Sequence, residues 1–252
     1  MFQQQSRGLR LHGWALDPHG YSGDDGFSAL LQPLHPEHPI RQTTTKIVTN
    51  FMTTHTIESV MLIMQEVYVS TDIESDGPIP GPNSMLSFGS VALTEDGEEI
   101  RSFSRNLELL SGASGDLDTM AWWKTQPEAW VSCRQSLISP EQAMREFVEW
   151  VGSLNGKPVF VAYPAGFDFL FVYWYLMKFV GKSPFSFSAI DVKSFAMALM
   201  RKPYRDCTKR NMPKHWFPKD ASHTHVALDD AREQGLMFIN MLRESKRSRP
   251  CL

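Results

Sequence analysis

Several features that define other classes of protein are scarce in this sequence. Its three cysteines, Cys133, Cys207 and Cys251, form no CxxC pair, so the sequence indicates neither a disulfide scaffold nor a thiolate zinc site, and we expect reduced thiols. No apolar run approaches the roughly 20 residues that cross a bilayer. The amino terminus lacks the charged-then-apolar pattern of a secretory signal. We therefore expect a soluble, cytoplasmic protein with no membrane partner.

The composition is that of an ordinary globular protein. With 252 residues, 42% of them hydrophobic and 21% charged, the chain is long enough for one good core and a small appendage. Residues 1–64 follow neither a helical nor a strand period, and we expect a low-complexity or poorly ordered extension there. The domain is expected at residues 65–245, followed by a basic tail at 246–252. The oligomeric state is left open, and a homodimer is one arrangement that the sequence allows.

The charges are unevenly distributed along the chain. The net charge of -3 argues at first against a polyanionic partner, but residues 193–219, here called the basic segment, carry a local charge of +7 with Asp206 as their single acid. The segment also holds Tyr204, Trp216 and Phe217, and basic side chains interleaved with aromatic ones suit phosphates and unstacked bases. A solvated, mobile loop is the alternative. The basic residues are Lys193, Arg201, Lys202, Arg205, Lys209, Arg210, Lys214 and Lys219.

A strand near the start of the expected domain carries two acids. Apolar and polar residues alternate from Val67 to Glu74, which is the period of a β-strand. Asp72 and Glu74 therefore project from one face, about 7 Å apart along the strand. Two carboxylates at that spacing can each reach one divalent cation or flank a pair of cations. An isolated Asp-x-Glu is common by chance, so its function depends on what else converges on it.

The remaining pattern predicts alternating strands and helices. Two strands are joined by the hairpin signal Asp96-Gly97, and Ser139-Pro140-Glu141-Gln142 matches a capping box at the start of a helix. The predicted elements are strands Met85–Leu93 and Glu99–Leu107, a helix from Ser139 to Gly156, strand Pro158–Ala162, helix Phe167–Val180, strand Ser186–Val192, and helices Lys193–Met200 and Leu228–Leu242. This order is that of a ribonuclease-H-like α/β fold. Its central sheet is mixed and five-stranded, with a three-stranded antiparallel meander and two parallel strands, and helices flank it.

Further acids and a histidine lie on the later elements. Asp168 stands between Phe167 and Phe169 in a nearly all-apolar helix, where a carboxylate is costly to bury without a counter-ion, although a helix-capping role competes. His225 and Asp230 lie near the start of the last helix. Carboxylates that converge can hold Mg²⁺ or Mn²⁺, and an imidazole can accept a proton from attacking water.

The motifs on these elements resemble those of DnaQ-like exonucleases of the DEDDh type, a family of metal-dependent enzymes that remove nucleotides from the 3′ ends of DNA or RNA. Asp72-Ile73-Glu74 matches the Asp-x-Glu of the first motif, and Phe167-Asp168 matches the second. The third motif, often HxALxDA, is matched by residues 225–231, and the resemblance spans about residues 66 to 244. The chain departs from the family at Tyr163-Pro164, where His-Asn is common.

The resemblance implies a mechanism and a set of site residues. Two ions, Mg²⁺ or Mn²⁺, would be bound, His225 would act as general base, and the products would be 5′-nucleoside monophosphates. Ser75 and Gly77, just past the first motif, are candidates to contact the terminal sugar. The partner would be the 3′ end of single-stranded DNA or RNA. The metal ligands implied are Asp72, Glu74, Asp168 and Asp230.

The spacing of the third motif predicts where its histidine lies. If His225 and Asp230 lay in one regular helix, five residues at 3.6 per turn would place them about 140° apart, too far round to share a site easily. We therefore expect His225 on the loop or frayed first turn before the helix. Asp229 competes with Asp230 as the third-motif ligand, and the family spacing from His225 favours Asp230.

Other functions remain open at this point. A non-catalytic nucleic-acid-binding module on the same fold would explain the basic segment but has no need for the acidic set. A ribonuclease-H-type endonuclease shares the carboxylates but does not require the His-x4-Asp signature. Trp122 and Trp123 suit either stacking on a base or packing in the core.

Overall fold

The computed structural model describes residues 65–219 and 225–247 of the chain. The expected amino-terminal extension, residues 1–64, lies outside the described residues, as do Cys251 and most of the expected basic tail. The last helix continues through Lys246 and Arg247, two residues past the boundary expected for the domain. Within the described part, no helix is both long and apolar enough to pass through a bilayer.

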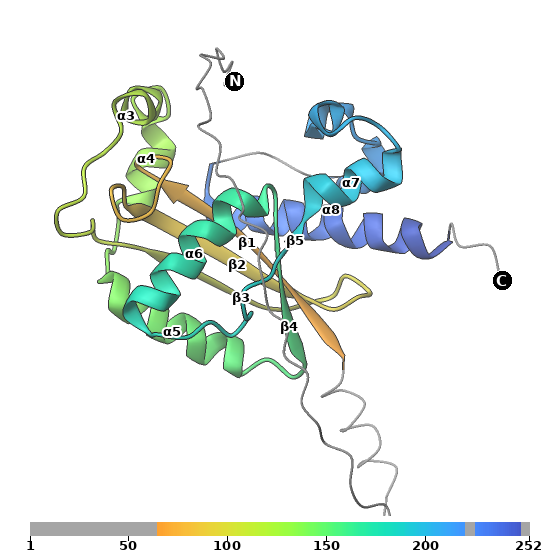
Figure 1. Cartoon of the computed structure of the whole chain (residues 1–252), viewed down its shortest axis with the longest axis horizontal. Helices are drawn as coiled ribbons and strands as arrows, with labels where there is room; N and C mark the ends of the chain where they lie inside the picture. Colours follow the sequence, from red (N-terminus) through yellow and green to blue (C-terminus); the bar gives the residue numbers. More distant parts are fainter. Residues whose placement is uncertain (1–64, 220–224, 248–252) are drawn as a thin grey trace, which may run out of the picture. The chain divides into compact units, whose positions relative to one another are not determined.

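The described domain is built on one mixed sheet whose strand order is β3-β2-β1-β4-β5 (Figure 1). The three strands β1, β2 and β3 form an antiparallel meander, and β4 and β5 extend it in parallel with β1. The predicted ribonuclease-H-like topology is therefore confirmed. The strands are β1 Glu66–Ser75, β2 Met85–Leu93, β3 Glu99–Asn106, β4 Lys157–Ala162 and β5 Ile190–Asp191.

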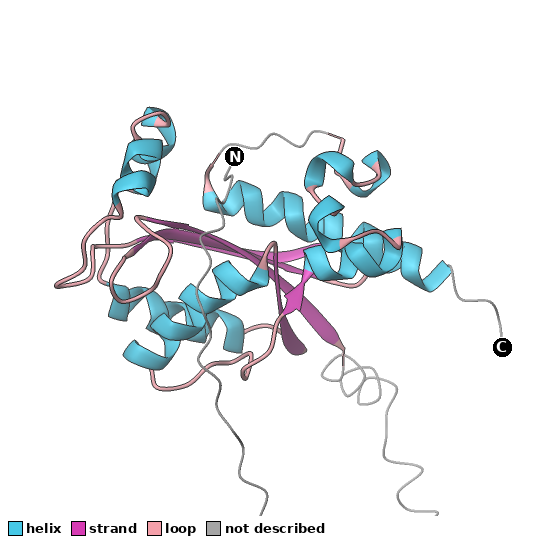
Figure 2. Cartoon of the chain, turned by 45° about the horizontal axis from the view of Figure 1, so that its top comes forward, coloured by secondary structure: helices cyan, strands magenta, loops and turns pink. Residues whose placement is uncertain are grey.

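Helices cover both faces of the sheet (Figure 2). Helices α5 and α6 pack on one face over a large apolar core, and α7 and α8 pack on the other face over a second core. The helices are α3 Leu117–Trp123, α4 Pro127–Cys133, α5 Pro140–Gly152, α6 Ala165–Phe179, α7 Val192–Met200 and α8 Ala227–Arg247.

The alternation in β1 decides which helix each side chain meets. Val67, Val69 and Ile73 belong to the core under α5 and α6, whereas Tyr68 belongs to the core under α8. Because side chains two apart share a face, Asp72 projects with Tyr68 toward the α8 side. The strand thus buries one apolar face and turns its acids toward the last helix.

The start of α5 follows the predicted capping motif. Ser139 is its N-cap, and the Ser139 hydroxyl oxygen accepts a hydrogen bond from the backbone N–H of Gln142 at 3.2 Å, with Pro140 at the first helical position. This places the apolar stripe of α5 against the sheet, where Met144 and Phe147 are fully buried. Capping and amphipathic period therefore agree in this element.

Two features of the fold were not predicted correctly. The strand expected at Ser186–Val192 is wrong in length, because only Ile190 and Asp191 pair with β4 and the preceding residues form a turn. Phe187 in that turn is 83% exposed, so the apolar run there did not mark a buried strand. Short helices α3 and α4 were not predicted, although Asp116 caps α3 by accepting a hydrogen bond from Thr119 N–H at 2.9 Å.

Candidate active site

The first two carboxylates stand where β1 leaves its parallel neighbour. Pairing between β1 and β4 ends at Ser70 opposite Val161, so β1 runs on alone along that edge. Asp72 and Glu74 lie in this extension and are half-buried. The N–H of Ile73 between them has no β4 partner and instead donates to Asp168 Oδ1 at 3.3 Å. The gap between the strands therefore admits a carboxylate from another element.

That carboxylate belongs to the first turn of α6. Asp168 is only 3% exposed, and its Oδ2 atom has no hydrogen-bond partner in the described part of the chain. The start of α6 is fixed by Asp191, whose carboxylate accepts hydrogen bonds from Ala165 N–H at 2.9 Å and Ser194 N–H at 2.6 Å. Asp191, which sequence reasoning missed, thus ties the first turns of α6 and α7 together and positions Asp168.

The third motif separates its two neighbouring acids. Asp230 is 3% exposed and faces the sheet, whereas the Asp229 side chain is about half exposed and lies 3.5 Å from the guanidinium of Arg232. His225 lies outside α8, with φ of 54°, on the segment that enters the helix. This is the loop position predicted from the spacing, and it leaves a ring nitrogen within 4.8 Å of a carboxylate oxygen of Asp230. The His225 ring also meets Trp122 edge to face, with centroids 5.1 Å apart.

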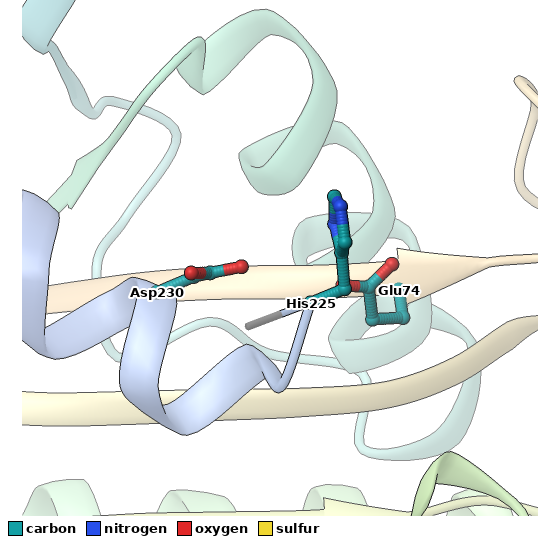
Figure 3. Close-up of side chains that lie close together, drawn as sticks. All are labelled: Glu74, His225 and Asp230. Carbon is teal, nitrogen blue, oxygen red and sulfur yellow. The ribbon is translucent and has the colours of Figure 1, made fainter. Parts of the chain in front are cut away.

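The side chains from these separate elements converge on one place. Ligand atoms of Glu74, His225 and Asp230 all lie within 4.8 Å of one another. Figure 3 shows Glu74 on the strand, Asp230 on α8 and His225 on the segment before α8. Residues more than 150 positions apart in the sequence are thus within reach of one ion.

Electrostatic effects place the remaining two carboxylates in the same cluster. Burial, followed by the charges of Asp168, Glu74 and Asp230, raises the pKa of Asp72 well above its usual range. Burial and then the charges of Asp230 and Asp168 raise the pKa of Glu74 to about 8, and burial raises the pKa of Asp168 to about 8. The charge of Lys209 acts in the opposite sense on Asp72 and Asp168. The cluster therefore holds more negative charge than its nearby cation balances.

A glycine allows α8 to approach the sheet closely enough to complete this cluster. Gly89 on β2 lies directly opposite Asp72, and a Cβ atom there would lie 2.4 Å from the backbone of Leu228. Gln234 further along α8 donates to the carbonyl of Thr71 at 2.7 Å. Contact at both points fixes the height of the helix start above Asp72. The role of Gly89 was not predicted, because the local sequence around it does not reveal that the backbone of Leu228 packs against it.

Adding a methyl group at Gly89 tests this close approach. We expect Gly89→Ala to lift the first turn of α8, lowering nuclease activity by about 100-fold and stability by about 1–3 kcal/mol, the usual cost of overpacking. Gly152→Ala in α5 is the matched control, because a Cβ there meets nothing within 4 Å. Activity and thermal unfolding of both variants are compared with the parent. Full activity in Gly89→Ala would show that the helix start need not lie so close.

Ser75 and Gly77 are engaged within the protein. The Ser75 hydroxyl is nearly buried and donates to the Gly77 carbonyl at 2.8 Å, and a Cβ on Gly77 would collide with the Asn83 side chain. These contacts close the turn after β1, and contact with a terminal sugar stays a prediction. Trp123 is a core residue, 2% exposed, whose indole N–H donates to the Ser75 carbonyl at 2.9 Å, whereas Trp122 borders the site.

The departure at Tyr163-Pro164 leaves a structural role for the tyrosine. Pro164 is the N-cap of α6, and the Tyr163 hydroxyl donates to the Cys207 carbonyl at 3.2 Å. Cys207 and Cys133 are both buried free thiols, as predicted. Tyr163 therefore joins the end of β4 to the basic segment. It does not supply the side-chain amide of the asparagine that is common here in the family.

Domains that gather acids and a histidine at this edge of a ribonuclease-H-like sheet make up the DEDDh class of 3′–5′ exonucleases, and comparison with known proteins agrees. The chain belongs to the family described as 3'-5' exoribonuclease Rv2179c-like domain, whose model matches residues 68–242. It is therefore a 3′–5′ exonuclease. The match lies within the domain expected from the sequence.

Individual relatives support this placement. The chain is 30% identical over 189 residues to the 3'-5' DNA exonuclease Cap18 of Escherichia coli, a match that covers 73% of this chain and 96% of the relative. Among solved structures it is similar to the nuclease domain of 3'hExo, a DEDDh family member bound to rAMP. That match has 12% identity and a TM-score of 0.54 and covers 73% of this chain and 96% of the other. The zinc-bound E. coli ExoI–ssDNA complex also matches, with 12% identity, a TM-score of 0.52 and coverage of 74% and 42%. The last two likenesses concern the fold.

Proposed function

We propose that Asp72, Glu74, Asp168 and Asp230 hold two divalent cations, Mg²⁺ or Mn²⁺, and that His225 is the general base for hydrolysis of the 3′-terminal phosphodiester bond. The observation that carries the proposal is the convergence of four carboxylates, three of which, Asp72, Glu74 and Asp168, have pKa values raised by burial and by neighbouring acids. Such a cluster is costly to keep unless a cation neutralises it. Among residues 65–219 and 225–247, Lys209 is the cation whose charge lowers the pKa values of Asp72 and Asp168, and its ammonium group also lies 3.2 Å from Glu233 Oε1.

The donor atoms fit hard divalent ions. Carboxylate oxygens suit Mg²⁺ or Mn²⁺, and two divalent ions would balance four carboxylate charges. Asp168 is arranged for such a role, since Ile73 N–H holds its Oδ1 atom while Oδ2 has no hydrogen-bond partner among the described residues. One carboxylate oxygen is thus fixed by the backbone and the other is available to a cation.

The residues of the chain would then divide the reaction between them. Cations held by Asp72, Glu74, Asp168 and Asp230 would supply Lewis-acid chemistry to the reaction. His225 accepts a proton from the attacking water, whose oxygen bonds to phosphorus as the bond to the 3′ oxygen breaks. The edge-to-face contact with the Trp122 ring restricts the imidazole. The leaving 3′ oxygen takes up a proton from solvent water. The product is a 5′-nucleoside monophosphate and a strand shorter by one nucleotide.

The names of the relatives support a nucleic-acid strand as the substrate. Cap18 is named a DNA exonuclease, the family model is described as an exoribonuclease, and the 3'hExo and ExoI structures contain rAMP and single-stranded DNA. We assign the 3′ end of a single strand as the substrate of this chain, within the cytoplasm. Whether the sugar is ribose or deoxyribose is decided by experiment, because a single hydroxyl distinguishes them.

A time course on 5′-labelled oligonucleotides tests the function. Matched DNA and RNA strands, single-stranded and duplex, are incubated with Mg²⁺, Mn²⁺ or chelator. We expect a ladder that shortens from the 3′ end with either ion and no cleavage with chelator. Internal cuts would indicate a ribonuclease-H-type endonuclease. Binding without any metal-dependent cleavage would indicate a non-catalytic nucleic-acid-binding module.

The stability of the metal-free protein should report the same cluster. The pKa of the Asp168 carboxyl is about 8 in the folded chain against 3.8 for an ordinary aspartate, so the folded state binds more protons between those values. Stability from this group is therefore fully present at low pH and is lost as pH rises toward 8. In chelator we expect Asp168→Asn to raise the melting temperature at pH 8 by about 3–5 °C, while abolishing activity.

Metal ions should reverse this loss in the parent alone. Added Mn²⁺ is expected to raise the melting temperature of the parent at pH 8 and to leave that of Asp168→Asn nearly unchanged, by mass action on the folded state. Differential scanning fluorimetry across pH 5 to 8 measures both effects. If Asp168→Asn in chelator melts at a lower temperature than the parent at pH 8, the carboxylates of the cluster do not repel one another as proposed.

A further inference from the structure

We propose that the basic segment, residues 193–219, binds the phosphodiester backbone of the substrate strand upstream of its 3′-terminal nucleotide. This inference rests on the proposed function and deepens it, because it adds a second place at which the strand is held. It implies that the preferred substrate is a strand of several nucleotides and not a dinucleotide.

The first support is uncompensated charge. The segment carries +7 in a chain whose net charge is -3, which leaves -10 on the rest of the chain. Lys202, Arg205, Arg210 and Lys214 are exposed, and none of them has a carboxylate within salt-bridge distance in residues 65–219 and 225–247. Exposed cations held together repel one another, and an anionic ligand relieves that repulsion.

The second support is that the segment is held in a fixed shape. Three short 3-10 turns, Tyr204–Asp206, Lys209–Asn211 and Lys214–Trp216, place Cys207, Met212 and Trp216 in the core under α8. The Trp216 indole N–H donates to Glu244 Oε2 at 2.6 Å, and Asn240 donates to the Trp216 carbonyl at 2.9 Å. Trp216 is 1% exposed, so its ring is not among the aromatic groups of the segment that can stack on a base. The anchoring also argues against a solvated, mobile loop.

The third support is the position of the segment beside the acidic cluster. Lys209 Nζ lies 3.2 Å from Glu233 Oε1, one helical turn beyond Asp230, and its charge reaches Asp72 and Asp168. At the other end, His215 Nε2 lies 2.7 Å from Glu244 Oε2 on the same helix. Figure 1 shows the segment running beside α8. The surface therefore leads away from the catalytic residues along that helix.

The length of this surface suits several nucleotides. Glu233 and Glu244 are eleven residues apart on α8, a rise of about 16 Å. Stacked nucleotides rise about 3.4 Å each, so the surface spans roughly five of them. Tyr204 is the exposed aromatic residue of the basic segment, at 43% exposure, and Lys193 Nζ lies 4.4 Å from its ring centroid, so this pair offers a stacking group beside a positive charge.

Neutralising two lysines far from the catalytic residues tests the proposal. The variant is Lys202→Gln with Lys214→Gln, and its matched control is Lys157→Gln with Lys182→Gln. The control lysines are equally exposed but lie at the start of β4 and just past the end of α6, away from the acidic cluster. Affinity for labelled twelve-nucleotide DNA and RNA strands is measured in chelator between 50 and 200 mM salt, where no cleavage competes.

We expect the test variant to bind the strands about tenfold more weakly, with a slope of log affinity against log salt shallower by about 1.4, because each lost single-strand phosphate contact removes about 0.7. The control should match the parent in both quantities. With Mg²⁺, the variant should lose kcat/KM on the long strand and keep it on a dinucleotide. An affinity and salt slope equal to those of the control would overturn the proposal.

Two other outcomes would also overturn it. Equal loss on the dinucleotide would mean that the lysines act on the catalytic residues and not on an upstream strand. Binding of an oligoglutamate of matched charge as tightly as the strand would mean that the surface takes any polyanion. If the parent hydrolyses neither substrate, the proposed function fails, and the affinities in chelator still decide whether the segment holds a strand.

Discussion

Asp230→Asn is expected to lower kcat/KM on a single-stranded oligonucleotide by about 1000-fold or more, equivalent to roughly 4 kcal/mol of transition-state stabilisation. Asparagine keeps the size of the side chain but removes its charge and weakens it as a ligand for Mg²⁺ or Mn²⁺. Asp230 is 3% exposed, and its charge acts on Asp72 within the acidic cluster. The same substitution at Asp72 should have an effect of the same order.

The neighbouring residue provides a control one position away. Asp229→Asn makes the same chemical change on the same turn of α8, but its side chain is turned outward toward Arg232. We expect its activity to stay within about twofold of the parent, as for most exposed sites. Steady-state kinetics and thermal unfolding are measured for both variants. Similar losses in the two would mean that the helix phase assigned to the third motif is incorrect.

His225→Ala is expected to lower kcat by about 100- to 10,000-fold, the usual contribution of a general base. Because an imidazole accepts a proton only when neutral, the rate of the parent should rise with pH until the ring is deprotonated. The variant should lack that rise, since no other described imidazole lies in the cluster. Added imidazole should restore part of its activity by entering the space left by the side chain.

A second histidine controls for nonspecific effects. His215 lies outside the acidic cluster, on the basic segment that is proposed to bind the strand, so His215→Ala should keep the pH dependence of kcat at saturating substrate even if its KM changes. Mn²⁺ affinity of His225→Ala should fall much less than that of Asp230→Asn, because four carboxylates remain. An unchanged pH profile in His225→Ala, or no rescue by imidazole, would count against its role as base.

The sequence was sufficient to predict the features that depend on strand and helix periodicity. Alternation placed Asp72 and Glu74 on one face of β1, and five-residue spacing placed His225 before the last helix. Adjacent positions on a helix point in different directions, which separates Asp230 from Asp229. The family spacing favoured Asp230 as the ligand, and Asp230 is the buried one of the two. These inferences succeed because backbone geometry fixes side-chain direction over a few residues.

Local periodicity could not predict contacts between elements that are far apart in the sequence. Gly89 matters because the backbone of Leu228 lies against it, although the two are far apart in sequence. Asp191 ties two helix starts together from the end of a two-residue strand. Trp216 stands among basic residues in the sequence, yet its ring packs in the core under α8. In each case the deciding neighbour belongs to another element.

The number of Mn²⁺ ions bound per chain tests the central claim most directly. Equilibrium dialysis followed by electron paramagnetic resonance of free Mn²⁺, with a nucleoside 5′-monophosphate present to complete the coordination, should give two ions for the parent. Asp168→Asn and Asp230→Asn should each bind fewer, while Asp229→Asn should bind two. Absence of stoichiometric binding by the parent, or undiminished binding by Asp168→Asn, would contradict the account.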